Sequence, residues 1–249
     1  MSEPIAFADV LALVPAMEEQ LRAAGTKERA DHEQAYLKSS LEHFGTSVPA
    51  IRAVAVRLHR SRPDLEHDDV VRLVEALWSA PVHERRMLAV EVLDQFAGRL
   101  SPADLGLVER LVRESRTWAL VDGLAADVAG RIVLAAPDDA VVGATLDRWA
   151  ADDDFWVRRA SLLAELKLLR DGGDFARFAR HADAMLGEKE FFIRKAIGWV
   201  LRETARTRPD EVVAWLEPRV SLASGVTLRE AVKPLSDDQR ARLGVRRRP

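Results

Sequence analysis

Residues 188–208 read E-K-E-F-F-I-R-K-A-I-G-W-V-L-R-E-T-A-R-T-R. Apolar residues recur at intervals of three and four along this stretch, which predicts an amphipathic helix over Glu190–Arg208. Trp199 and Arg202 are three residues apart, so they lie on nearly the same side of that helix. Gly198 costs a helix about 1 kcal/mol relative to alanine, which indicates that another segment approaches the backbone there. On composition alone, the stretch is a buried core helix whose arginine extends to solvent.

The composition is that of a globular protein. The chain has 249 residues, of which 48% are hydrophobic and 31% charged, enough for one large domain or an elongated repeat array. It has no cysteine, which excludes disulfides, cysteine–zinc sites and thiol nucleophiles. The opening M-S-E-P-I-A-F-A-D carries acid where a signal peptide carries base, and no run approaches the roughly 18 apolar residues of a membrane span. We therefore expect a cytoplasmic protein without membrane contact.

Charge is segregated along the chain. The formal net charge is −3, yet residues 155–210 carry twelve Lys and Arg against eight Asp and Glu. That segment is therefore net +4, and the remainder of the chain is net −7. Such a distribution is compatible with one basic face on an acidic body.

Helical patterns run from end to end, and the alternation typical of strands is nearly absent. Proline and glycine mark the boundaries between successive stretches. Besides the opening stretch, we expect helices over Phe7–Ala24, Lys27–His43 with Thr26 as N-cap, the segment between Pro49 and Pro63, Asp68–Ser79, His83–Phe96, Leu105–Arg116, Thr117–Leu134, Asp139–Ala150, Phe155–Arg170, Phe175–Leu186, Val212–Leu216 and Thr227–Lys233.

These helices repeat along the chain. Arg52, Arg86, Asp122, Arg159 and Lys195 occupy comparable points of successive second helices, at steps of 34, 36, 37 and 36 residues. A period in the mid-thirties with two helices per unit indicates an α-solenoid, in which equivalent positions form a ladder along one surface. The ladder predicted here is a row of cations interrupted by one carboxylate.

We therefore expect an all-α fold, a right-handed α-solenoid of HEAT-like helical repeats with a concave basic face. The whole chain, 1–249, is expected to form one such domain. It would comprise an N-terminal helical cap over 1–35, repeats and closing helices over 36–233, and a polar tail over 234–249. Within the tail, R-R-R at 246–248 is typical of a solvated segment.

Three stretches carry a resemblance to a known family. F-F-I-R-K-A-I-G-W-V-L-R-E at 191–203 closely resembles a helix of the bacterial alkylpurine DNA glycosylases built from HEAT-like repeats, the AlkD family. R-T-W-A-L-V-D-G-L at 116–124 and F-W-V-R-R-A-S-L-L at 155–163 resemble two further helices of that family. The resemblance extends from about residue 36 to the end of the chain.

The resemblance implies a catalytic cleft formed by Asp122, Trp118 and Trp199, with Arg159 and Arg202 contacting DNA phosphates. Without it, Trp118 and Asp122 would be a core tryptophan and a carboxylate placed to favour a helix dipole. We expect neither a metal nor a cofactor. The implied partner is double-stranded DNA containing alkylated purines, and we expect a monomer.

Further DNA contacts are implied less directly. Y-L-K-S-S-L-E-H-F-G-T-S-V-P-A-I-R at 36–52 resembles the family's entry segment, so Tyr36 is expected to reach the displaced nucleotide. A partly buried helix tyrosine is the alternative for that position. Lys167 matches a lysine beside the cleft, although a solvated lysine is the usual role. We add the adjacent cations Arg194 and Lys195 to the expected DNA contacts.

The residue types suit the implied reaction. A charged N3- or N7-alkylpurine leaves an oxocarbenium-like sugar behind, and a fixed carboxylate stabilises that charge as it develops. Tryptophan faces attract cations, and basic residues hold phosphates without reading sequence. The expected activity is that of a monofunctional DNA glycosylase that hydrolyses the N-glycosidic bond without base flipping. The alternatives are a catalytically silent DNA-shape binder and a protein-binding scaffold on the same fold.

Other kinds of site lack support in the sequence. The six histidines show none of the spacings of helical metal sites, and no glycine-rich phosphate loop is present. No serine lies in a G-x-S-x-G turn. The sequence therefore predicts no metal site.

Overall fold

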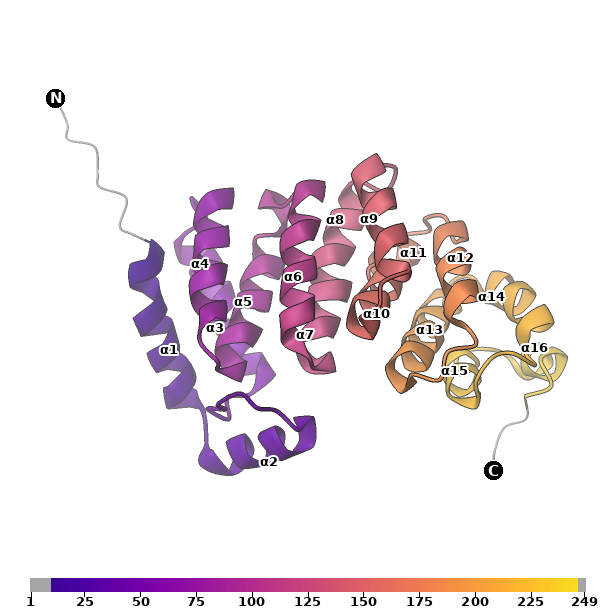
Figure 1. Ribbon diagram of the computed structural model, residues 1–249, viewed down its shortest axis with the longest axis horizontal. Coiled ribbons are helices and arrows are strands. Elements are labelled where there is room, and N and C mark those ends of the chain that lie inside the picture. The colour runs from indigo at the N-terminus through magenta and orange to yellow at the C-terminus, as the bar shows by residue number, and fades with distance from the viewer. Residues whose placement is uncertain (1–9, 246–249) are drawn as a thin grey trace. The chain divides into compact units, whose positions relative to one another are not determined.

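The computed structural model describes residues 10–245, which are mostly helical (Figure 1). Within that range the chain contains no β-strand, only isolated bridges. The predicted all-α class, with helices that repeat along the chain, is confirmed. The chain divides into two compact units, residues 1–100 and 101–249.

Most helices of each unit are joined by short loops. The first unit contains α1 (Leu13–Ala24), α2 (Lys27–Leu37), α3 (Val48–Ser61), α4 (His67–Ser79) and α5 (His83–Gln95). The second contains α6 (Leu105–Ser115), α7 (Trp118–Asp122), a π-helical turn (Gly123–Ala129), α8 (Gly130–Ala135), α9 (Ala140–Ala150), α10 (Phe155–Leu163), α11 (Leu166–Arg170), α12 (Ala176–Met185), α13 (Phe191–Thr204), α14 (Pro209–Leu216), α15 (Gly225–Ala231) and α16 (Asp237–Arg242).

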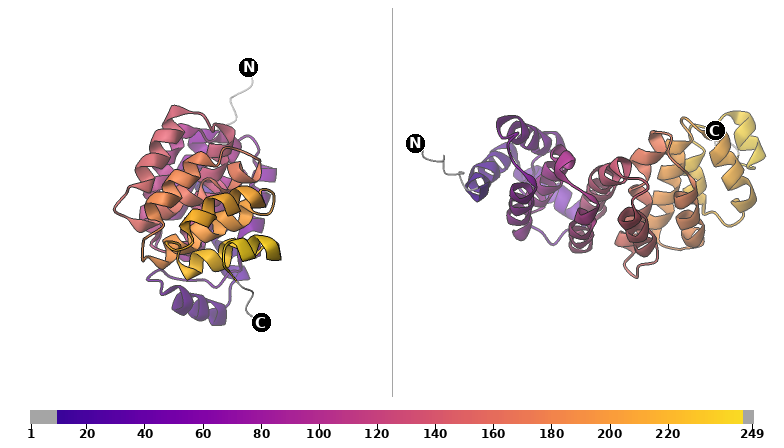
Figure 2. Two further views of the ribbon diagram at one scale, coloured as in Figure 1. Left: turned by 90° about the vertical axis from the view of Figure 1, so that its right-hand side faces the viewer. Right: turned by 90° about the horizontal axis from the view of Figure 1, so that it is seen from above.

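Neighbouring helices pack pairwise within each unit. In the first unit, α5 packs against both α3 and α4. In the second, α10 packs against α9 and α13, and α13 packs most closely against α15; Figure 2 shows α13 and α15 in orange and yellow from two further sides. The buried residues of these helices are mainly Leu, Val and Ala, which let helices approach closely.

The structure corrects the predicted helix over Lys27–His43. Its start is as expected, because the Thr26 side chain accepts the N–H of Arg29. The helix ends at Leu37, where Lys38 adopts a left-handed conformation with φ of 50°. The next residues, up to the start of α3, have no regular structure apart from isolated bridges.

A buried carboxylate holds this irregular segment. Glu84, in the first turn of α5, is fully buried and accepts the backbone N–H groups of Phe44, Gly45 and Thr46 at 2.9, 2.6 and 3.2 Å. Three backbone N–H groups of the segment that follows α2 are thereby satisfied. Because Glu84 is about forty residues away in sequence, local patterns give no sign of this contact.

The ladder positions are joined between successive repeats by ion pairs rather than forming an open row of cations. Three such pairs, with N···O distances of 2.9, 2.8 and 2.7 Å respectively, are Arg52–Glu91, Asp122–Arg159 and Lys195–Glu230. The carboxylate at position 122 is therefore the acidic member of one inter-repeat pair. Three cations of the predicted ladder are thus each paired with a carboxylate.

Gly198 lies where α13 meets α15. A Cβ atom at this position would lie 2.7 Å from the Cβ of Glu230 and 2.8 Å from the carbonyl oxygen of Thr227. These distances are shorter than side chains tolerate, so only glycine allows the two helices this separation. The predicted close approach to the backbone of Gly198 is confirmed.

The predicted helix Thr117–Leu134 is a single rod with a change of winding. It runs as α-helix over α7, as π-helix over Gly123–Ala129, and again as α-helix over α8. The N–H of Gly130 donates to the carbonyl of Ala125, five residues back, which is the hydrogen bond of a π-turn. The change of winding begins directly after Asp122.

Two other predicted segments differ from expectation. The helix over Phe155–Arg170 is broken between α10 and α11. The tail predicted over 234–249 contains α16, whose start is closed by a capping box between Ser236 and Gln239. The arginines at 246–248 and the first nine residues lie outside the described residues.

No helix within residues 10–245 is long and apolar enough to cross a membrane.

Candidate active site

Asp122 ends α7, and an arginine from α10 holds its carboxylate. Arg159 donates from Nε to Oδ1 at 2.8 Å and from Nη2 to Oδ2 at 2.9 Å. Its third donor, Nη1, reaches the carbonyl oxygen of Phe192 at 2.5 Å. This bidentate, charge-assisted arrangement fixes the orientation of the carboxylate.

Arg159 differs from its predicted role as a phosphate contact. Only 2% of the residue is exposed, and each of its three terminal nitrogens donates inward, to Asp122 or to Phe192. A phosphate contact would require the guanidinium to leave a buried position in which three of its N–H groups are bonded. Its geometry is that of a residue that positions Asp122.

Asp122 lines a small pocket of about 150 Å³. Trp199 from α13 and residues of the π-turn and α11 form its wall. The lining residues are Asp122, Gly123, Ala126, Asp127, Leu166, Lys167, Arg170 and Trp199. The structure thus brings together two of the three predicted catalytic residues, Asp122 and Trp199.

Trp118 lies at the start of α7, one helical turn before Asp122. Its side chain is not part of the pocket lining, and 36% of the residue is exposed. The preceding Thr117 is the N-cap of α7 and accepts the N–H of Ala119. Trp118 therefore presents indole surface to solvent on the helix that carries Asp122, and it is not a core tryptophan.

Lys167 lies in the pocket with its ammonium group paired. Its Nζ donates to Oδ1 of Asp127 at 3.0 Å, and 22% of its side chain is exposed. The structure therefore places the predicted lysine beside Asp122 and Trp199, not in a solvated position. Asp127 was not among the residues predicted for the site.

Arg202 and Lys195 share one carboxylate. Both side chains donate to Glu230 of α15, Lys195 at 2.7 Å. Burial alone would raise the pKa of Glu230, but its hydrogen bonds with Lys195 and Lys233 lower that pKa to about 2. Glu230 is therefore ionised at neutral pH. A phosphate must compete with its carboxylate for Arg202 and Lys195.

The remaining predicted contacts differ in their surroundings. Arg194 donates to the backbone carbonyl of Glu188 at 2.7 Å. Tyr36 belongs to α2 in the first unit, is 67% exposed, and has its ring parallel to that of His32, with centroids 6.5 Å apart. Tyr36 is thus an exposed tyrosine, not the partly buried one of the alternative interpretation.

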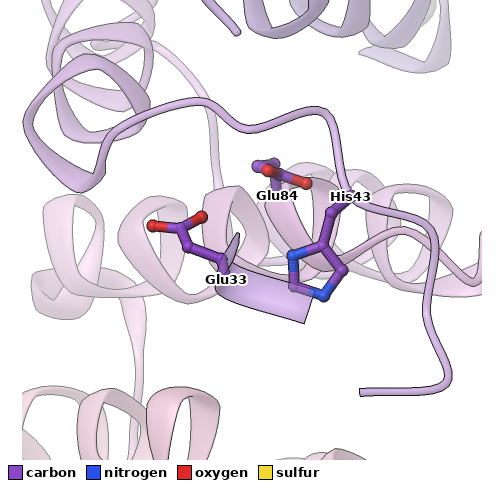
Figure 3. Close-up of side chains that lie close together, drawn as sticks. All are labelled: Glu33, His43 and Glu84. Carbon is purple, nitrogen blue, oxygen red and sulfur yellow. The ribbon is translucent and has the colours of Figure 1, made fainter. Parts of the chain in front are cut away.

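One group within residues 10–245 combines residue types that bind metal ions. Glu33, His43 and Glu84 offer ligand atoms within 4.8 Å of one another, and Figure 3 shows these side chains lying close together. The oxygens of Glu84 already accept three backbone N–H groups. Burial lowers the pKa of His43, and its ring stacks on His83 at a centroid distance of 4.5 Å. We interpret the group as the anchor of the segment that follows α2.

The sequence matches a model of a known protein family. A sequence model described as "DNA alkylation repair enzyme" matches residues 17–235. The chain belongs to this family. Its membership places the protein in DNA alkylation repair. Among curated proteins, no relative matches the chain.

A solved structure shares the fold of this family member. The predicted DNA alkylation repair enzyme from Enterococcus faecalis superposes with a TM-score of 0.72 at 24% sequence identity. The match covers 86% of this chain and 97% of the other. At this identity the likeness concerns the fold alone.

Proposed function

We propose that this family member is a monofunctional DNA glycosylase. It hydrolyses the N-glycosidic bond of N3- and N7-alkylated purines that carry a positive charge, within duplex DNA. The observation that carries this proposal is the Asp122 carboxylate, fixed by Arg159 in a pocket walled by Trp199.

The reaction needs little from the protein beyond electrostatics. As the bond from C1′ to the purine nitrogen breaks, its electron pair neutralises the charged base and leaves an oxocarbenium-like sugar. Asp122 is a preorganised anion that stabilises this developing charge. The exposed face of Trp118 and the indole of Trp199 add attraction for a cation. Water then adds to C1′ and loses a proton.

The size of the pocket supports a reaction in which the base stays in the duplex. Pockets that enclose small organic ligands are typically about 300–1,000 Å³, whereas this one is about 150 Å³. It offers space for water and the edge of a sugar more readily than for an alkylated purine. The proposal therefore includes no flipping of the base into the protein.

DNA contacts complete the proposal. Arg202, Lys195 and Lys167 are each paired with a carboxylate, so their phosphate contacts form by exchange of one anion for another. Within residues 10–245 the side chain of Arg194 has only a backbone acceptor, so it would bind phosphate at a smaller cost. Tyr36, an exposed residue on α2, is proposed as a further DNA contact.

The pairing of these cations is also the observation that favours the alternative. A scaffold whose basic residues are neutralised internally would bind DNA weakly, or would bind protein instead. The two functions predict different products. A glycosylase releases free base, whereas a silent binder or a protein-binding scaffold releases none.

The deciding experiment is an excision assay. Purified protein would be incubated with duplex DNA containing N7-methylguanine, and released base would be quantified by chromatography. Release above the spontaneous rate supports the glycosylase. No release, together with tight binding of the same duplex, would favour the silent DNA binder.

A further inference from the structure

A second carboxylate lies in the pocket of Asp122. Asp127 lines the same small cavity and belongs to the π-helical turn that follows α7. In an α-helix, a residue five positions on is about 140° round the axis from its predecessor. A π-turn has its hydrogen bonds five residues apart, which returns the fifth residue to nearly the same side. The change in winding is thus what places Asp127 with Asp122.

The two carboxylates have different surroundings. Each oxygen of Asp122 accepts an N–H of Arg159. Asp127 has a single hydrogen-bond partner among the described residues, Lys167, which donates to Oδ1 at 3.0 Å. Its side chain is 47% exposed, and within residues 10–245 the hydrogen bond from Lys167 engages Oδ1 and leaves Oδ2 without a protein donor.

The pocket has room for that water. A water molecule occupies about 30 Å³ of liquid, so a volume of about 150 Å³ corresponds to several waters. Polar groups of Asp127, Lys167 and Arg170 provide hydrogen-bond partners along one part of the wall. Water held there lies in the cavity that Asp122 also lines.

We infer that Asp127 is a further catalytic residue, the general base for the attacking water. This inference rests on the proposed glycosylase function. The bond from C1′ to the purine nitrogen breaks, with the departing base keeping the electron pair, and the water oxygen then forms a bond to C1′. The water proton passes to Oδ2 of Asp127. Asp122, held by Arg159, stabilises the sugar cation, and Lys167 orients Asp127.

The division of labour follows from how rigidly each carboxylate is held. A general base must lie within hydrogen-bond reach of the water it deprotonates. Both Asp122 oxygens are engaged in one rigid pair, which suits a fixed electrostatic role. Asp127 lines the same cavity, within residues 10–245 only its Oδ1 accepts a hydrogen bond, and its lysine partner holds it in place.

The experiment compares four proteins in single-turnover release of N7-methylguanine. These are wild type, Asp127→Asn, Asp127→Ala and the control Asp171→Asn, an exposed aspartate at the end of α11. We expect both Asp127 variants to lose about 10²-fold in rate. We expect the control to match wild type, and all four to bind an undamaged duplex within about twofold of one another.

Chemical rescue distinguishes a base from a merely structural group. Formate supplied in solution replaces a missing carboxylate base, so we expect it to raise the rate of Asp127→Ala about tenfold and to leave wild type unchanged. Rates of the Asp127 variants within twofold of wild type would overturn the inference, and so would slow variants that formate does not rescue. A wild-type protein that releases no base would instead overturn the proposed function itself.

Discussion

Asp122 has a proposed role in catalysis and also stabilises the fold by pairing with Arg159. Its carboxylate neutralises Arg159, which is 98% buried, so Asp122→Asn leaves a guanidinium without its counter-charge. Removing one partner of a buried pair costs about 3 kcal/mol. We therefore expect the substitution to lower both the excision rate, by roughly 10²-fold, and the free energy of unfolding.

These two effects are separable by measurement. Urea unfolding gives the loss of stability, and single-turnover excision at a temperature where the variant remains folded gives the loss of rate. A folded Asp122→Asn protein that excises N7-methylguanine at the wild-type rate would remove Asp122 from the mechanism.

Two arginines are expected to respond differently to substitution by alanine. Arg159→Ala should reduce excision and stability but leave the salt dependence of DNA binding unchanged, because Arg159 faces inward. Arg194→Ala should make the slope of log Kd against log salt shallower by about 1, because it is proposed to contact phosphate. Fluorescence anisotropy across a salt series measures both. A shallower slope for Arg159→Ala would show that it leaves its buried pair to bind DNA.

At the scale of elements, the contact between α13 and α15 is tested by adding one methyl group. Gly198→Ala should lower the free energy of unfolding by about 1–3 kcal/mol, because the new Cβ overlaps Glu230 and Thr227. Gly143→Ala in α9 is the matched control, since its Cβ would meet nothing within 4 Å. Helix propensity alone should make that control more stable, by up to about 1 kcal/mol. Equal responses of the two variants in urea unfolding would contradict the close packing.

The local sequence predicts the positions of most helices well. Thr26 and the prolines mark starts and ends by chemistry confined to a few residues, and the apolar period identifies the buried faces. The irregular segment after α2 depends on Glu84, and the π-turn depends on packing between helices. Neither the irregular segment nor the π-turn has a signal in the neighbouring sequence, so the sequence alone predicts neither of them.

The candidate site also contains residues that the sequence predicts and residues that it does not. Asp122 and Trp199 were predicted from their motifs, and the structure places both in one pocket. The inward direction of Arg159 and the presence of Asp127 follow from the register between helices. The sequence alone does not specify that register.

For the whole molecule, acid should destabilise the fold in two steps. Burial, with further contributions from His43 and Arg86, lowers the pKa of His83 to about 4. An unfolded chain therefore binds a proton that the folded chain excludes between about pH 6.5 and 4, and stability falls as pH falls through that window. Arg148 and its neighbours lower the pKa of Glu109 to about 2, so its contribution is lost between about pH 4.5 and 2.

The first step is measurable through the urea midpoint. Between pH 7 and pH 5, His83 should account for about 2 kcal/mol of lost stability. His83→Leu should remove that part of the difference. An unchanged difference in the variant would show that other groups titrate instead.

Lesion charge tests the central claim most directly. The proposed site has a fixed anion and tryptophan faces but no assigned acid to protonate a leaving base, so departure depends on charge that the lesion already carries. The measurement is release of base from two duplexes of identical sequence, one with N7-methylguanine and one with hypoxanthine. We predict that the protein releases N7-methylguanine and almost no hypoxanthine. Release of hypoxanthine at a comparable rate would contradict the account.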